Sequence, residues 1–353
     1  MVNELFRQYR ATMKKSTIRI GLFVGLTALL VFISLSASDV KIGLLEGIQI
    51  FIDHISGSEP SGFLPTLKDR IVFEQNMPRA LGAILAGATL SICGASLQSL
   101  IRNPLADPYT LGISSGAMFG MVLSVGLGIS IIPFINPDDG LILNAFVMSL
   151  LPTAIIVFIA TFKKVTPTMM ILTGIAVMYI FTALTTLIKY SVEAETLSFI
   201  YQWSIGSVSG ISWENIPKMI AGLLIVGVPM IFIHRRIDIV AQGDEGAIAL
   251  GIDPNKLRII SLILASLATS IIVCYTGTIG FVGLVAPHIA RIFVGSMGKM
   301  LVPASAILGA FMVLGSDYIV RLVDSSLPVG VILALVCSPV FIVILIKMRK
   351  SSW

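Results

Sequence analysis

The sequence predicts an all-α, polytopic membrane protein with about ten transmembrane helices. Three observations support this fold class: the composition, a series of long apolar runs, and the position of the basic residues between those runs. Of the 353 residues, 56% are hydrophobic and only 12% are charged, whereas a soluble domain carries about 25% charged residues. Such a chain is expected to lie in a lipid bilayer.

Ten apolar runs are candidates for transmembrane helices. A helix needs about 20 apolar residues to cross about 30 Å of hydrocarbon. The runs are Ile20–Leu35, Ala80–Ile101, Leu111–Pro133, Leu141–Phe162, Thr168–Tyr190, Ile216–Ile233, Leu257–Tyr275, Ile279–Val294, Leu301–Val323 and Val329–Ile346. Because their number is even, both termini are expected on the same side of the membrane.

The basic residues indicate which side that is. Seventeen of the 24 Lys and Arg residues fall in segments on the same side as the N-terminus, and the positive-inside rule therefore places both termini in the cytoplasm. We expect one membrane domain over 1–353, with a cytoplasmic segment at 1–19, a cytoplasmic loop at 234–257, and modest outer loops at 36–77 and 191–215. The basic residues flank the apolar runs and form no aromatic-interleaved patch, so a nucleic-acid partner is not expected.

Two other features of the chain have simple interpretations. The first run follows a basic stretch and precedes small residues at 36–38, a pattern also found in cleaved signal peptides, but nine further runs favour an uncleaved helix. Cys93, Cys274 and Cys337 lie in three different runs without metal or redox spacing. No metal or cofactor is therefore expected in this chain.

A polar hairpin separates the second and third runs. Residues 102–116 read R-N-P-L-A-D-P-Y-T-L-G-I-S-S-G, and proline removes backbone donors, so this segment must lie in water or against protein. A similar glycine-rich helix and break occur at 276–291, T-G-T-I-G-F-V-G-L-V-A-P-H-I-A-R. The second and seventh runs enter from opposite sides, so a duplication here would be an inverted repeat, as in many transporters.

Few charged residues fall inside the runs, where each costs about 2.5–3.5 kcal/mol on insertion scales. Asp317 and Arg321 are four residues apart, which fits either an ion pair within one helix or a direct functional role. His288 and Arg291 end the eighth run, and there we expect extension towards the interface. The runs contain almost none of the carboxylates expected of an ion-coupled carrier, and the chain lacks G-x-x-x-x-G-K-[ST]. The energy for transport would then come from another protein.

The loop at 234–258 predicts a short helix. Asp244 and Glu245 suit a helix start, Ala247 and Leu250 would form an apolar face, and Gly251 can end the helix. An exposed amphipathic helix of this kind either docks in the groove of a soluble partner or lies on lipid or on its own bundle.

Six motifs in order carry a resemblance to a known family. They are M-P-R-A-L-G-A-I-L-A-G-A-T-L-S-I-C-G-A-S-L-Q from Met77, R-N-P-L-A-D-P-Y-T-L-G from Arg102, W-x-x-G-S at 203–207, G-x-x-x-A-x-x-L-G at 243–251, G-F-V-G-L-V-A-P-H-I-A-R from Gly280 and L-P-V-G-V from Leu327. Together they resemble the FecCD-type permease subunits of binding-protein-dependent ABC importers for iron-siderophore complexes, haem or vitamin B12.

The resemblance implies a type II ABC importer permease fold and a defined set of partners. Two ten-helix permeases, identical or paralogous, would form a path through a prokaryotic plasma or inner membrane. Two ATP-binding subunits would handle ATP-Mg on the cytoplasmic side, and a substrate-binding protein would dock from outside. The permease itself would not be an enzyme. An iron-siderophore complex is the first expectation for the cargo, and an ion-coupled secondary transporter is the alternative.

The resemblance also implies roles for individual residues. Those for coupling to the ATPase are Gly243, Asp244, Glu245, Ala247, Leu250 and Gly251; those for a cytoplasmic gate are Asn103, Leu105, Pro167 and Thr168; those for docking of the binding protein are Arg79 and Arg321. The chain departs from the family pattern at Asn76, Ser326 and Cys337, where the family often has Arg, Glu and Gly. These departures suggest a heterodimer.

Overall fold

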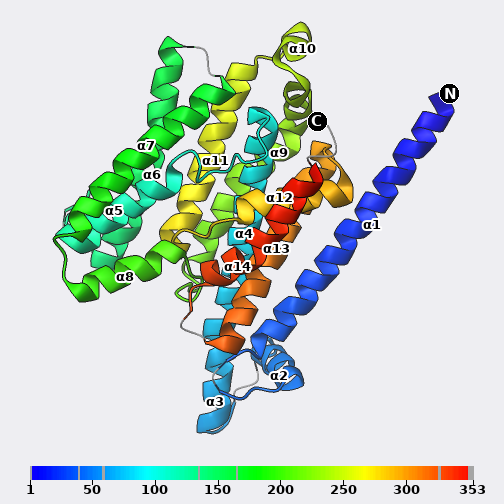
Figure 1. Ribbon diagram of the computed structural model, residues 1–353. Helices are drawn as coiled ribbons and strands as arrows, with labels where there is room; N and C mark the ends of the chain where they lie inside the picture. The colour runs from blue at the N-terminus through cyan, green and yellow to red at the C-terminus, as the bar shows by residue number, and fades with distance from the viewer. Residues whose placement is uncertain are drawn as a thin grey trace.

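The computed structural model describes residues 2–38, 40–57, 60–133, 136–163, 166–324 and 327–348. Within these ranges every regular element is a helix (Figure 1). In chain order they are α1 (Val2–Leu35), α2 (Leu44–Ile55), α3 (Phe63–Arg70), the π-helix η1 (Ile71–Asn76), α4 (Met77–Ile101), α5 (Ile113–Leu127), α6 (Pro137–Phe162), α7 (Pro167–Lys189), α8 (Ala194–Ile205), α9 (Ile216–Gln242), α10 (Asp244–Ala249), α11 (Pro254–Thr276), α12 (Val282–Val294), α13 (Gly298–Val323) and α14 (Val329–Met348).

The ten apolar runs correspond one to one to ten of these helices, which confirms the predicted fold class. Seven helical segments of the described chain are long and apolar enough to cross a membrane, and α5, α12 and α14 are shorter apolar helices. The ends of α1 and α14 that carry the termini lie at the same end of the bundle as α10, whereas α2 and α3 lie at the opposite end (Figure 1). This arrangement is the one expected from an even number of spans.

Helix α4 forms the centre of the bundle. Its most apolar window is 89% buried, against 17% for α1, because small residues let its neighbours approach closely. A Cβ atom at Gly87 would overlap the backbone of Gly309 in α13, and one at Gly94 would overlap the carbonyl of Gly283 just inside α12. The glycine-rich segment of α4 and the start of α12 therefore pack directly against each other.

The polar stretches contain helices that the sequence analysis did not predict. Residues 36–77 form α2, α3 and η1, and residues 191–215 include α8. Helix α2 begins at Gly43, whose backbone N–H donates to the Glu46 carboxylate at 3.0 Å. Helices α3 and η1 continue without a break into α4, so 63–101 is one helical segment of 39 residues.

Candidate functional site

The hairpin after α4 is held by its own polar side chains. Arg102 ends α4 in the left-handed conformation, with φ 52°. The Asn103 side chain accepts a hydrogen bond from the Leu105 backbone N–H at 2.9 Å, and Asp107 accepts one from the Thr110 backbone N–H at 2.7 Å. Asx turns of this kind fix a tight loop. The Leu105 side chain remains 48% exposed.

Asp107 is buried within this hairpin, where only 7% of its surface is exposed. Burial raises the pKa of this carboxyl to about 6, and the hydrogen bonds from Thr110 oppose the shift. A carboxylate normally remains ionised well below this range. The hairpin therefore contains a group that titrates near neutral pH.

The other two gate candidates begin α7. Pro167 is its first residue, and Thr166 caps it by accepting from the Met169 backbone N–H at 3.2 Å. Ala106 of the hairpin and Met170 of α7 belong to one hydrophobic cluster. The structure thus brings the two predicted gate segments into one packed region, with Leu105 and Thr168 exposed on it.

The predicted coupling helix is present as α10. Gly243 and Gly251 flank it with φ of 147° and 76°, values that favour glycine. The expected apolar face is wrong in one respect: Ala247 is fully buried against the bundle, whereas Leu250 is 68% exposed and Ile248 is 63% exposed. The reason is the bend of the chain after Ala249, where α10 ends and Leu250 leaves the helical path. Ile248 and Leu250 are thus the apolar side chains that a partner could contact.

Asp244 connects α10 to the rest of the protein. Its carboxylate accepts two hydrogen bonds from Arg258, with Nη1–Oδ2 2.9 Å and Nη2–Oδ1 2.7 Å, and one from Arg102, with Nη2–Oδ1 3.1 Å. The hydrogen bonds from Arg258 lower the pKa of Asp244. Sequence reasoning missed both arginines as functional candidates, although Arg102 opens one family motif and Arg258 closes the 234–258 loop.

The two predicted docking arginines lie together at the other end of the bundle. Arg79 and Arg321 both bind Asp317, with Nε–Oδ1 2.7 Å and Nη2–Oδ2 2.9 Å. Arg321 also donates to the Asn76 side chain at 3.1 Å and to the Ser34 backbone carbonyl at 2.9 Å. The ion pair expected between Asp317 and Arg321 is confirmed. The side chains of Arg79 and Arg321 are only 12% and 3% exposed. Through their contacts with Asp317 and Ser34, these two arginines also connect α1, α4 and α13.

The interpretation of Arg291 as an interfacial side chain is wrong. Its Nη1 donates to Gln98 Oε1 of α4 at 2.5 Å, and its Nη2 donates to Ser99 Oγ at 3.4 Å. The Gln98 amide in turn donates to the Gly283 and Leu284 carbonyls. Arg291 therefore points into the bundle, because the last turn of α4 offers acceptors that lipid does not.

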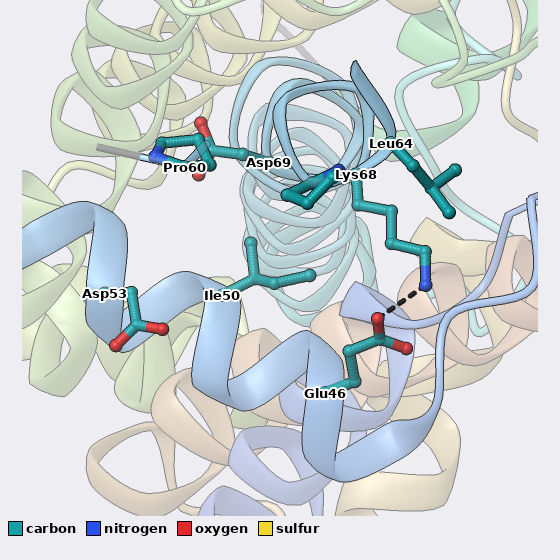
Figure 2. A pocket seen from close by; sticks show the side chains of 8 residues that line it. Glu46, Ile50, Asp53, Pro60, Leu64, Lys68 and Asp69 are labelled. Carbon is teal, nitrogen blue, oxygen red and sulfur yellow. Dashed lines mark hydrogen bonds and ion pairs between the residues drawn. The ribbon is translucent and has the colours of Figure 1, made fainter. Parts of the chain in front are cut away.

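A pocket of about 360 Å³ lies between α2 and α3 (Figure 2). Figure 2 shows Lys68 reaching from α3 to the Glu46 carboxylate of α2, with which it forms an ion pair. The pocket lining also includes Asp53 and Asp69. Within the described ranges, no group of three or more His, Cys, Asp or Glu residues is placed to hold a metal ion.

Comparison with known proteins identifies the family. A family model described as the FecCD transport family matches residues 26–347. The chain belongs to the FecCD transport family. Two of its relatives are the iron(3+)-hydroxamate import system permease FhuG of Bacillus subtilis, 32% identical with 95% of this chain and 99% of that protein covered, and the vitamin B12 import system permease BtuC of Vibrio cholerae, 32% identical with 81% and 86% covered.

A solved structure has the same fold over nearly the whole chain. It is an inward-facing conformation of a protein assigned to the metal-chelate type of ABC transporter, with TM-score 0.80, 27% identity, and 94% and 99% of the two chains covered. This FecCD protein is therefore a multi-pass membrane permease with the type II ABC importer fold. Its relatives are named for two different cargoes.

Proposed function

We propose that this chain is one of two permease subunits of an ATP-driven importer. The importer moves a bulky iron-siderophore complex, or haem or cobalamin, through the plasma or inner membrane. Separate ATP-binding subunits supply the energy, and an external binding protein delivers the cargo. Both termini and α10 face the cytoplasm in this proposal, in keeping with the positive-inside rule.

The observation that carries the proposal is the exposed apolar tip of α10. Ile248, on α10, is 63% exposed and Leu250, directly after α10, is 68% exposed, at the end of the bundle where the termini lie. An apolar surface beyond the membrane-spanning part fits the groove of a soluble partner. Because these six residues are already helical in the structure, they can enter such a groove without a change from disordered to helical chain. This reduces the conformational-entropy cost of binding.

The remaining predicted site residues fit the two ends of a transport path. Leu105 and Thr168 are exposed in the packed region formed by the hairpin and α7, which suits a gate on the ATPase side. Arg79 and Arg321 together outweigh Asp317 by one positive charge at the opposite end. That charge suits docking of an acidic surface, where electrostatic attraction speeds association and sets orientation.

The cargo class is proposed from the relatives. Those compared above are named for iron-hydroxamate and vitamin B12 import, and both are large chelates of a metal ion. An iron-siderophore complex is the first candidate, because relatives from both Helicobacter pylori and Bacillus subtilis are named for the transport of iron complexes.

One experiment separates this proposal from an ion-coupled carrier. The permease would be reconstituted in lipid vesicles with its ATP-binding subunit and binding protein, and uptake of a ferric siderophore, haem and cobalamin would be measured with and without ATP. We expect uptake of one cargo that needs ATP, is blocked by vanadate and is unaffected by collapse of ion gradients. Uptake that follows an ion gradient and ignores ATP would overturn the proposal.

A further inference from the structure

We propose that Asp244 is a positioning residue that transmits movement of α10 to the gate hairpin, residues 102–108, by holding Arg102 and Arg258 together. We call these three side chains the clamp. The inference rests on the proposed function, because it assumes that α10 moves with an ATP-binding partner and that the hairpin is a gate.

The clamp joins elements that are far apart in the sequence. Asp244 opens α10, Arg258 lies in the first turns of α11, and Arg102 is the residue that ends α4. Arg258 binds both carboxylate oxygens, a geometry that fixes direction as well as distance. Arg102 adds a third hydrogen bond to Oδ1, at 3.1 Å. A shift of the Asp244 carboxylate must therefore displace both arginines.

Arg258 extends the connection to the base of the hairpin. Its side chain is 1% exposed, and its Nε donates to the Leu100 backbone carbonyl at 3.2 Å. Leu100 lies in the last turn of α4, two residues before Arg102. Because the hairpin starts from that turn, it has two polar connections to α10: one through the Arg102 side chain and one through the α4 backbone that Arg258 contacts.

Few other contacts hold α10 in place. A six-residue helix has little stability of its own, and Ala247 is its buried side chain. A Cβ atom added at the flanking Gly243 or Gly251 would meet no atom within 4 Å outside its own surroundings in the chain. Asp244 is thus the strong polar connection of α10 to the bundle, and the glycines on either side leave the helix able to move as a unit.

Asp138 provides a matched control. It is exposed to solvent in the first turn of α6, and the structure shows no ion pair for it within the described part of the chain. Asp244→Asn and Asp138→Asn are the same substitution at two positions. Only the first removes a charge that Arg102 and Arg258 share.

The test uses the full importer in vesicles and measures ATP hydrolysed per cargo molecule imported. The wild-type protein must first show ATP-driven uptake. If it does not, the proposed function fails, and this outcome is distinct from a failure of the inference about Asp244. For Asp244→Asn we expect an assembled complex that still hydrolyses ATP, with at least about a fivefold rise in ATP used per import, the lower range of typical coupling energies. Asp138→Asn should stay close to wild type.

Arg102 variants keep the test independent of folding. The Arg102 side chain is 42% exposed, so Arg102→Gln leaves the Arg258–Asp244 pair in place, and Arg235→Gln is its control. Arg102→Gln should raise the ratio of ATP hydrolysed to cargo imported, and Arg102→Lys should bring this ratio part of the way back to the wild-type value. The double variant Arg102→Gln with Asp244→Asn should have a ratio no higher than that of Asp244→Asn alone. A wild-type ratio in Arg102→Gln, or additive effects in the double variant, would overturn the inference.

Discussion

A single buried carboxylate, Asp317, organises the charged cluster near the start of α4. Asp317 is fully buried and contacts both Arg79 and Arg321, so the ion pair first seen as i,i+4 spacing is only part of the cluster. The sequence indicates that Asp317 and Arg321 are neighbours because both lie on one helix. The contact with Arg79 spans 238 residues, and no local pattern encodes it.

We predict that Asp317→Asn strongly destabilises the protein. The change leaves two buried guanidinium groups with a neutral partner, and breaking a buried ion pair costs about 3–5 kcal/mol. The free energy of unfolding in mild detergent would be measured, with Asp138→Asn as a control at an exposed position. A loss as small as that of the control would show that the cluster contributes little to stability.

Asp107 predicts a dependence of stability on pH. Its folded-state pKa, raised to about 6 from 3.8, means that the folded protein binds the proton more tightly than the unfolded chain. Its contribution to the free energy of unfolding therefore falls as the pH rises through the window between these values and is lowest above about pH 6.

The corresponding variant is Asp107→Asn, which keeps the oxygen that accepts from Thr110. We expect it to raise the unfolding temperature relative to wild type at about pH 7.5 and to have little effect at about pH 3, below the titration window. Equal shifts at the two pH values would contradict the assignment of the titrating group.

At the scale of elements, the apolar runs predict which membrane helices form, and the helix-end signals predict where some of the helices begin and end. Each of the ten runs became a helix because about 20 apolar residues in lipid have few other ways to satisfy their backbone. The ends of α10 and α11 were also predictable, from the glycines and from Asp253, which caps α11. Helices α2, α3 and α8 were missed because they are short and lie in polar stretches, where stability depends on contacts with other elements.

Helix α4 gives a prediction at this scale. Gly94→Ala should destabilise the protein by about 1–3 kcal/mol or more, because the new methyl group would overlap the Gly283 carbonyl. Gly227→Ala in α9 is the matched control, since the nearest atom to its new Cβ would be Ile92 Cδ1 at 3.9 Å. The midpoints of thermal unfolding would be compared. A shift for Gly94→Ala no larger than for Gly227→Ala would mean that the helices separate at little cost.

At the scale of the whole molecule, the two ends of the helical bundle carry different elements and different charged clusters. Helices α2 and α3 lie at the end of the bundle opposite α10 (Figure 1). The hairpin and the clamp belong to the α10 end, because Asp244 binds Arg102, whereas the Asp317 cluster contacts Arg79 at the start of α4, which continues α3 and η1. The residues that the resemblance assigns to the gate and to coupling are thus separated from Arg79 and Arg321. Which side chains are exposed could not be predicted, because the burial of Arg79 and Arg321 depends on Asn76, Ser34 and Asp317 from three separate segments.

If a binding protein docks as proposed, the positive charge of the Asp317 cluster should influence how fast it associates. Arg79→Gln removes the one net positive charge of the cluster and should slow association, most clearly at low ionic strength, where screening is weak. Association rates would be measured at two salt concentrations, with Lys41→Gln as the control at an exposed cation of the same end. Equal rates for the two variants would place the docking surface elsewhere.

The uninterrupted segment made of α3, η1 and α4 has a consequence for the height of the protein above the lipid. At about 1.5 Å per residue, its 39 residues measure about 58 Å, which exceeds the 40–45 Å of a bilayer with its headgroups. The tip near Phe63, which is 85% exposed, would therefore stand in the aqueous phase. A polarity-sensitive fluorescent probe attached there should report an aqueous environment when the protein is placed in lipid vesicles.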